Sequence, residues 1–410
     1  FLSLATNVFG VVDCSTIGTN GSITVDTNLT DDLNTSGNCL TILGSNITLN
    51  CQGHTLTGNN SGIGIRLGGV TPLANRENNV IKNCTIQNFS DGIYIFGDDS
   101  PSSTDTKDNN ITNNTLTGNT NGISFNGNEN KIFNNHIWNN NIYDRIYTSF
   151  TGTGNSFCEN FVGNTYFNNA TGPTCNGWYP YSDMKVGDKI VIQPGTFYLN
   201  SALKLRGNSG IDCNNSVTFD GNNAGGIGIQ IGGTPPYYYS ASNSEVKNCS
   251  LQNFANAIHL YGDTTSFAVL TNDNNITGNV TTNNTYGIIF GGTESRVNNN
   301  KIWNNIINDK IFTPFTGVGN TFCLTNVGNT YNGNATGPSC SGWYPYSGMK
   351  VNAKITIQPG TFYLNAPIYL RQNSGVNCNN LVVLDGNGSA IGAQFGGVQP
   401  YYYATNSELK

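Results

Sequence analysis

Short apolar stretches alternate with turns rich in asparagine and glycine along most of the chain. Valine, isoleucine, leucine and aromatic residues return at regular intervals between the asparagine clusters. Asparagine and glycine favour turns and the left-handed backbone conformation, whereas short alternating apolar stretches are typical of strands. The pattern therefore predicts an all-β chain built from many short strands.

The apolar residues form pairs five positions apart, each within the pattern Asn-x-hydrophobic-x-x-Asn. The pairs are Ile81 with Ile86, Ile111 with Leu116, Ile132 with Ile137, and then Val246 with Leu251, Ile276 with Thr281, Val297 with Ile302. In each series the second step between pairs is shorter than the first, and polar Thr281 is the one poor fit. The shorter step predicts a coil of about 21 residues with two or three strands, and the longer step predicts the same coil with an inserted loop at 98–108.

Such a coil is the rung of a parallel β-helix, in which each strand pairs with its counterpart one coil away at roughly 4.8 Å. Every side chain then stacks on its equivalent in the next coil. We expect the asparagine clusters to form ladders at the corners, where stacked amides hydrogen-bond along the axis.

A longer repeat of about 165 residues contains these coils. KNCTIQNF at 82–89 returns as KNCSLQNF at 247–254. We expect tandem β-helix units at 1–174, which includes an N-terminal start segment, at 175–339, and at 340–410, where the third unit is incomplete. The expected continuation is either more of the same polypeptide or another chain that completes the open end.

The opening at 14–58 and the Asn-Asn-x-Ile coils after it resemble the right-handed parallel β-helix repeat proteins of pectate-lyase-like shape, which include archaeal and bacterial surface proteins. The resemblance implies a right-handed parallel β-helix solenoid over most of the chain. It also implies a stapling disulfide between Cys14 and Cys39. The architecture hosts lyases, hydrolases, tailspikes, adhesins and structural proteins, so the resemblance does not choose a function.

Only 10% of the 410 residues are charged, and the formal net charge is -6. A nucleic acid partner needs a concentrated Lys/Arg stripe, which the sequence lacks. The sequence also contains no apolar run of transmembrane length. We expect neither a nucleic acid partner nor a membrane span.

The eleven cysteines indicate disulfides and an oxidising, extracellular setting. The short interval between Cys158 and Cys175 is repeated by Cys323 and Cys340, which predicts two hairpin disulfides. The recurrence also suggests pairs of Cys51 with Cys84 and of Cys213 with Cys249, with stacked free thiols as the alternative. Cys378 is left without a partner, because the repeat would place its partner at position 414.

Seventeen Asn-x-Ser/Thr sequons suggest N-linked glycans. They begin at Asn20, Asn28, Asn34, Asn46, Asn59, Asn83, Asn88, Asn110, Asn113, Asn169, Asn214, Asn248, Asn275, Asn279, Asn283, Asn334 and Asn387. Many sequons arise by chance in a chain this rich in asparagine and threonine, so one sequon alone is weak evidence.

The candidate catalytic and metal-binding residues do not converge. Asp144 with Arg145 recurs as Asp309 with Lys310, which we interpret as a structural ion pair in preference to a catalytic centre. His54, His136 and His259 do not recur in the repeat, so we expect no catalytic residues, no metal site and no cofactor other than glycans. The pairs Asp31/Asp32 and Asp98/Asp99 are solvated loop charges in our interpretation, with weak calcium binding as the alternative.

The aromatic segments WYPY at 178–181 and 343–346 follow the two predicted hairpins. They are either platforms on which carbohydrate stacks or plugs that cover the exposed strand edges at a coil end. We favour packing or interface roles for these aromatics. The residues concerned are Trp178, Tyr179, Tyr181, Trp343, Tyr344 and Tyr346.

An array of similar coils with disulfides and sequons suggests a structural glycoprotein of the cell surface. We expect a subunit of a filament, fibre or coat whose copies join end to end. One alternative is a β-helix that binds or cleaves polysaccharide, and loss of activity on substituting Asp144 or Asp309 would favour it. The other alternative is a surface adhesin.

Overall fold

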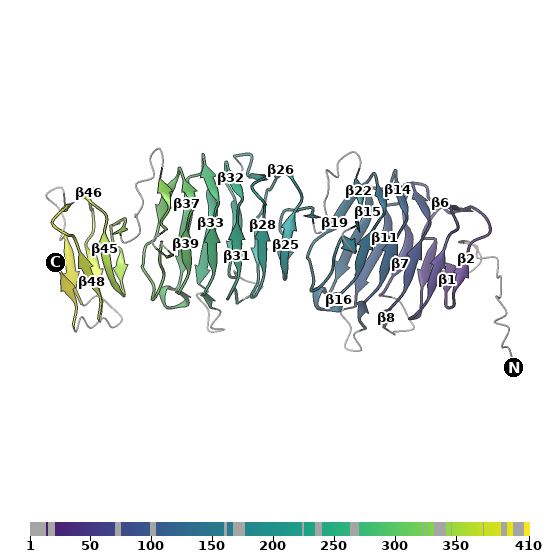
Figure 1. The fold of residues 1–410 in the computed structure, drawn as a ribbon, viewed down its shortest axis with the longest axis horizontal. Coiled ribbons are helices and arrows are strands. Elements are labelled where there is room, and N and C mark those ends of the chain that lie inside the picture. The colour runs from purple at the N-terminus through teal and green to yellow at the C-terminus, as the bar shows by residue number, and fades with distance from the viewer. Residues whose placement is uncertain are drawn as a thin grey trace. The chain divides into compact units, whose positions relative to one another are not determined.

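The chain folds as a parallel β-helix of about 12 turns, as the computed structural model shows (Figure 1). The structure describes residues 14, 21–69, 75–98, 104–159, 162–166, 177–223, 225–233, 240–262, 270–322, 324–325, 327–331, 342–345, 347–371, 373–386, 392–396 and 406–410. The predictions of an all-β chain and of stacked parallel strands are confirmed.

Two compact units make up the chain: unit 1 is Phe1–Tyr181 with Val191–Pro194, and unit 2 is Ser182–Ile190 with Gly195–Lys410. The division into three tandem units at 174/175 and 339/340 stays a prediction. Strands nevertheless recur at the interval of the sequence repeat, as the starts of β11 (Asp91–Gly97) and β33 (Asn256–Gly262) show.

Unit 1 stacks its strands in three long sheets and one short sheet (Figure 1). The first sheet contains β1 (Gly21–Ile23), β4 (Leu40–Ile42), β7 (Ile63–Leu67), β11, β15 (Asn121–Gly127) and β19 (Arg145–Thr148). The second contains β2 (Thr27–Asn28), β5 (Thr48–Asn50), β9 (Val80–Lys82), β13 (Asn110–Thr112) and β17 (His136–Trp138). The third contains β3 (Leu33–Asn34), β6 (Thr55–Thr57), β10 (Thr85–Gln87), β14 (Thr115–Thr117), β18 (Asn141–Ile142) and β22 (Thr165–Tyr166), and the short sheet contains β8 (Arg76–Glu77), β12 (Thr106–Lys107) and β16 (Ile132–Phe133).

The remaining short elements of unit 1 follow β15 in the chain. They are the 3-10 helix η1 (Glu129–Lys131), the antiparallel pair β20 (Cys158–Glu159) and β21 (Val162–Gly163), and β23 (Gly177–Trp178), which pairs with Val191 and Ile192 of β25 (Lys189–Ile192). β12 lies within the predicted loop 98–108, so that insertion carries a strand of its own.

Unit 2 repeats the arrangement. One sheet contains β24 (Lys185–Val186), β27 (Leu203–Leu205), β30 (Ile227–Ile231), β33, β37 (Tyr286–Gly292) and β41 (Lys310–Phe312), and the next contains β28 (Gly210–Asp212), β31 (Glu245–Lys247), β35 (Asn275–Thr277) and β39 (Lys301–Trp303). The third contains β26 (Gly195–Tyr198), β29 (Val217–Asp220), β32 (Ser250–Gln252), β36 (Val280–Thr282), β40 (Ile306–Ile307) and β42 (Thr330–Tyr331), with the short β34 (Thr271–Asn272), β38 (Val297–Asn298) and helix η2 (Glu294–Arg296) beside them.

The last part of unit 2 begins the same three sheets again. Its strands are β43 (Gly342–Trp343), β45 (Lys354–Ile357), β48 (Gly375–Asn377) and β51 (Glu408–Leu409), then β44 (Lys350–Val351), β47 (Ile368–Leu370) and β50 (Ala393–Phe395), and β46 (Gly360–Tyr363) with β49 (Val382–Asp385).

The core consists of apolar rows inside each unit. Ile65, Ile93, Ile123 and Ile146 occupy equivalent positions in successive coils of unit 1, and none is more than 2% exposed. Burial of an isoleucine side chain contributes roughly 1.5–3 kcal/mol. Repetition of one inward position from coil to coil therefore gives a continuous apolar axis.

Asparagine ladders line the corners, as the sequence predicted. Asn109 donates from Nδ2 to Asn135 Oδ1 (2.8 Å) in the next coil and to the carbonyl oxygen of Arg76 (2.8 Å) in the coil before. The columns in unit 1 are Asn79–Asn109–Asn135–Asn155, Asn114–Asn140–Asn164 and Asn119–Asp144, and those in unit 2 are Asn274–Asn300–Asn320, Asn279–Asn305–Asn329 and Asn284–Asp309. Most of these side chains are buried, so the ladder satisfies polar groups that water does not reach.

The predicted register of the shorter coil is wrong by five residues. Ile137 stacks on Ile111, and Ile132 lies in β16 opposite Thr106. Equivalent asparagines are therefore 30 and then 26 residues apart, so the second coil is longer than the sequence interpretation made it. Unit 2 has the same register, with Ile302 on Ile276.

Thr281 provides a test of the core row in the third sheet. It lies between Leu251 and Ile307, is 1% exposed, and its hydroxyl has no hydrogen-bond partner among the described residues. We expect Thr281→Val to raise the free energy of unfolding by about 1 kcal/mol, because it removes an unsatisfied buried hydroxyl. Urea denaturation measures the change, with exposed Thr330→Val as the control.

The reverse change tests the same row in unit 1. Leu116 occupies the position that corresponds to Thr281 and is fully buried. Leu116→Thr should therefore lower the free energy of unfolding by about 2 kcal/mol, because apolar area is lost and a hydroxyl is buried. A neutral effect of both substitutions would show that this row does not bear on stability.

Candidate functional site

Three predicted disulfides are present. They join Cys14 to Cys39, Cys51 to Cys84, and Cys213 to Cys249. The alternative of stacked free thiols is therefore wrong for the last two pairs. Cys378 carries a free thiol, and burial raises its pKa.

The two predicted hairpin disulfides are not tested. Cys158 lies in β20, whereas its proposed partner Cys175 lies outside the described residues. Cys323 and Cys340 lie outside them as well.

An aromatic cluster, which we call the plug, closes the core of unit 1 at its last coil and consists of Phe125, Phe150, Phe157 and Trp178. Phe125 is fully buried, and its ring lies 6.4 Å from Phe150, 6.2 Å from Phe157 and 6.2 Å from Trp178 between centroids. Trp178 is 3% exposed and meets the Phe157 ring edge-on at 5.0 Å. Burial on this scale leaves Trp178 no face on which a sugar could stack.

The tyrosines of the first WYPY segment lie closer to the surface. Tyr181 contacts Tyr179 at 4.9 Å and Tyr147 at 5.6 Å between ring centroids. The guanidinium of exposed Arg145 lies 5.2 Å from the Tyr181 ring. These residues therefore pack in a cluster of aromatic rings and one cation beside the plug.

Unit 2 contains the same plug one repeat later. Phe290 lies 6.1 Å from Phe315, 6.1 Å from Phe322 and 6.4 Å from Trp343 between ring centroids. Trp343 is 8% exposed. Tyr344 packs against Phe362 at 5.1 Å, and Tyr346 lies outside the described residues.

Beside this plug, the backbone of one repeat pairs with the backbone of the next. Phe315 forms a parallel bridge with Lys350 of β44. The Lys350 amide donates to the Pro314 carbonyl oxygen at 3.0 Å, and the Thr316 amide donates to the Lys350 carbonyl oxygen at 3.1 Å. This isolated bridge thus joins the end of the second repeat to the first coil that follows it.

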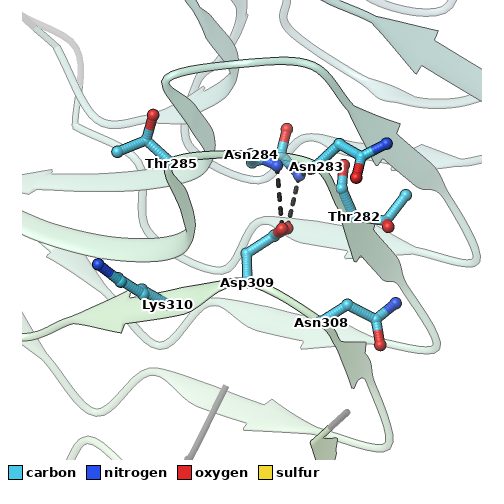
Figure 2. A pocket seen from close by; sticks show the side chains of 7 residues that line it. All are labelled: Thr282, Asn283, Asn284, Thr285, Asn308, Asp309 and Lys310. Atoms are coloured by element: carbon cyan, nitrogen blue, oxygen red, sulfur yellow. Dashed lines mark hydrogen bonds between the residues drawn. The ribbon is translucent and has the colours of Figure 1, made fainter. Parts of the chain in front are cut away.

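A polar hollow of about 520 Å³ lies on unit 2 (Figure 2). It is lined by Thr282, Asn283, Asn284, Thr285, Asn308, Asp309 and Lys310. The Asp309 carboxylate points toward Asn284 and accepts from its backbone amide at 2.9 Å and from its Nδ2 at 2.7 Å (Figure 2). Asp309 is the one carboxylate in this lining, whereas glycosidic cleavage needs a pair.

The predicted ion pairs at Asp144 and Asp309 are wrong. Within the described residues, neither carboxylate pairs with the basic residue that follows it, because each aspartate is buried whereas Arg145 and Lys310 are exposed. Asp144 accepts from Asn119 Nδ2 at 2.6 Å and is 8% exposed, and this burial raises its pKa. Both aspartates end an asparagine column, where a side chain that only accepts hydrogen bonds is sufficient.

The other candidate ligands also lie apart. Asp32 accepts from the Thr55 amide and lies 3.3 Å from His54 Nδ1, which together hold its pKa below the usual value. Asp98 is buried, and Asp99 lies outside the described residues. No group of three or more His, Cys, Asp or Glu side chains gathers in the part of the chain that the structure describes. Calcium binding stays untested.

The described sequons differ in the solvent exposure of their asparagine side chains. Asn28, Asn34, Asn46, Asn59, Asn113, Asn214 and Asn283 are exposed, and Asn83, Asn88, Asn110, Asn248 and Asn275 are half-buried. Asn279 is 1% exposed and belongs to a ladder, so we no longer expect a glycan there. Asn20, Asn169, Asn334 and Asn387 lie outside the described residues.

His259 predicts a pH-dependent stability for unit 2. Its ring is mostly buried among uncharged neighbours, with Gln230 and Ile289 in the adjacent strands and Tyr261 beside it, and neither ring nitrogen has a hydrogen-bond partner among the described residues. Burial lowers its pKa from 6.5 to about 4. As the pH falls, His259 therefore binds a proton in the unfolded chain at a higher pH than in the folded chain. The stability that is present above pH 6.5 is lost as the pH falls toward 4.

The loss should reach at most about 3 kcal/mol, since each pKa unit corresponds to about 1.4 kcal/mol. Urea denaturation at neutral pH and near pH 4.5 measures it. His259→Tyr introduces the residue type found at the corresponding Tyr94, and should remove this part of the acid sensitivity. Equal acid sensitivity in the variant would assign the effect to other groups.

The sequence interpretation did not single out two of the tryptophans. Trp138 and Trp303 lie outside the WYPY segments, yet each donates from Nε1 to an asparagine one coil earlier, Asn110 and Asn275 respectively, at 2.7 Å. The available signal was their recurrence at the interval of the long repeat.

Among the described residues, no helix is long and apolar enough to cross a membrane. Comparisons with protein-family models, with curated proteins and with solved structures give no match for the chain. The fold and the geometry of its residues therefore carry the functional argument.

Proposed function

We propose that the chain is an extracellular structural glycoprotein, a subunit of a cell-surface filament, fibre or coat that assembles end to end. The supporting observation is the junction at Phe315 and Lys350, where the backbone of one repeat hydrogen-bonds to the backbone of the next. A β-helix that extends itself in this way lengthens without a new kind of contact.

Three disulfides fit an oxidising, extracellular setting. The asparagine ladders and the aromatic plugs hold the coils together. Polar residues and sequons occupy the outer surface of the coils. No described carboxylate pair favours a polysaccharide-cleaving role at the hollow of unit 2, so the structural role has the stronger support.

The surface on which assembly would depend is the coil at β49 and β50. Each of these strands has a partner on one side only among the described residues, and Leu381, Val383 and Phe395 are 62%, 56% and 48% exposed. Such an edge takes either a following coil of the same polypeptide or the coil of a second molecule.

Electron microscopy of the isolated protein tests the proposal, with its intact mass measured in parallel. We expect end-to-end filaments, and dispersed monomers would contradict the proposal. Val383→Lys should shorten the filaments, because a lysine on an exposed edge opposes strand pairing. Its control is Thr218→Lys at the corresponding position of β29, whose strand has partners on both sides.

A further inference from the structure

Most described sequons have a structural reason for their asparagine. Seven lie at corners where the backbone has a positive φ, at Asn46, Asn83, Asn88, Asn113, Asn214, Asn248 and Asn283. Asparagine is favoured there because it adopts the left-handed conformation at little cost. A threonine or serine two residues later then completes a sequon by chance.

Asn110 and Asn275 have no such reason. Both lie in strands, β13 and β35, where asparagine is disfavoured. Their neighbours in the same row are Val80 and His136 in unit 1, and Glu245 and Lys301 in unit 2. Strand pairing therefore accepts apolar, acidic and basic side chains at this position.

A tryptophan fixes the amide at both positions. Trp138 Nε1 donates to Asn110 Oδ1, and Trp303 Nε1 donates to Asn275 Oδ1, each at 2.7 Å. The tryptophans are the register partners of the sequon threonines Thr112 and Thr277. The oxygen of each amide is thus held by the indole, while the Nδ2 group has no hydrogen-bond partner among the described residues.

We propose that Asn110 and Asn275 carry N-linked glycans whose first sugar lies against the indoles of Trp138 and Trp303. This inference rests on the proposed extracellular glycoprotein. The apolar face of a sugar ring matches the half-buried indole, whose polar N–H group is already satisfied. Two glycans held in this way would project from equivalent places on the two units.

The modification is a transfer from a lipid-linked oligosaccharide diphosphate. The bond between the anomeric carbon and the diphosphate oxygen breaks, and the bond between that carbon and Nδ2 forms. The amide loses one proton, and the lipid diphosphate leaves. The product keeps one N–H group and the Oδ1 acceptor, so the bond from the tryptophan is preserved.

The buried sequon at Asn279, four residues after Asn275, provides an internal contrast. Asn279 Nδ2 donates to the Val246 carbonyl oxygen at 2.9 Å and to Asn305 Oδ1 at 3.0 Å, so both of its hydrogens are in use. A glycan on Asn279 would break the ladder. Because a chain modified at Asn279 could not form this ladder, the folded, secreted protein is expected to carry sugar on Asn275 and none on Asn279.

The transfer to Asn110 must precede folding of its coil. Thr112 is 6% exposed, so the folded sequon around Asn110 is closed to an enzyme that reads its threonine. Folding then brings the tryptophan of the next coil onto the modified asparagine.

Mass spectrometry of peptides from the secreted full-length protein tests the proposal. We expect sugar on Asn110 and Asn275 and none on Asn279. Unmodified Asn110 and Asn275 beside modified corner sequons would overturn the inference. Filaments built from such protein would leave the proposed function intact, whereas dispersed but modified monomers would overturn the function alone.

Contact with the indoles has its own test. The double variant Thr112→Val with Thr277→Val removes both sequons but keeps the asparagines and tryptophans, and Thr115→Val with Thr285→Val removes the corner sequons at Asn113 and Asn283 as a control. Because Trp178 and Trp343 are buried, acrylamide quenching reports mainly on Trp138 and Trp303. We expect quenching to increase in the first variant only, and equal quenching in both variants would overturn the contact.

Discussion

Asn140→Ala is expected to lower the free energy of unfolding of unit 1 by about 4 kcal/mol, since each unsatisfied buried partner costs about 1–3 kcal/mol. Asn140 is 1% exposed and donates from Nδ2 to the Ile111 carbonyl oxygen at 2.9 Å and to Asn164 Oδ1 at 2.8 Å. Its own Oδ1 accepts from the backbone amide and from Nδ2 of Asn114, at 2.9 Å and 3.0 Å. Alanine removes all of these side-chain bonds. Asn164 Oδ1 keeps the backbone amide of residue 140 and Asn114 Nδ2 keeps the Ile81 carbonyl oxygen, but the backbone amide of Asn114 loses its partner.

Hydrogen exchange measured by mass spectrometry separates this effect from general destabilisation. Strand amides at 110–148 should lose protection, whereas those at 275–312 should keep it, because Asn305 preserves the equivalent column in unit 2. The control is Asn141→Ala, which changes the exposed neighbour of Asn140 and should alter stability by less than about 0.5 kcal/mol. A loss for Asn140→Ala as small as for Asn141→Ala would show that the ladder does not hold the coils together.

The fold class could be predicted because local signals agree with the global arrangement. Asparagine at the corners and branched residues in the strands indicate short strands. The similarity of one coil to the next then indicates that the strands stack on one another. The pairs Cys51–Cys84 and Cys213–Cys249 could be predicted for the same reason, since stacked coils bring repeated cysteines together.

The register was harder to predict because the pattern repeats within a coil as well as between coils. Asn109, Asn114 and Asn119 follow one another at intervals of five residues, and each belongs to its own column. A shift by five residues keeps asparagine on asparagine and apolar residue on apolar residue. The sequence around Ile132 therefore fits two registers, and the packing of whole coils selects one.

The role of Asp144 could not be predicted either. Its neighbour in the sequence is Arg145, which suggests an ion pair, but the fold buries the Asp144 side chain and exposes that of Arg145. Only the three-dimensional column shows that Asp144 ends a series of amides. The contacts of Trp138 with Asn110 depend in the same way on strands 28 residues apart in the sequence.

Phe290→Ala is expected to lower the free energy of unfolding of unit 2 by about 3–5 kcal/mol, the usual cost of removing a buried phenylalanine ring. Phe290 is fully buried and contacts Phe315, Phe322 and Trp343, which are themselves 4%, 4% and 8% exposed. Its removal leaves a cavity that three rigid rings cannot fill. Urea denaturation followed by circular dichroism measures the loss, with exposed Tyr363→Ala as the control.

The same variant tests whether the plug supports the junction between repeats. Phe315 touches Phe290 and also forms the bridge with Lys350, so a cavity at Phe290 should loosen the backbone bonds of Lys350 and Thr316. We expect the amides of these two residues to exchange faster than those of β27, which lies three strands away from β37 in the sheet. Phe125→Ala makes the corresponding cavity in unit 1 and should leave these two amides protected. Uniform loss of protection throughout unit 2 would instead mean that the plug stabilises the unit as a whole and has no particular role at the junction.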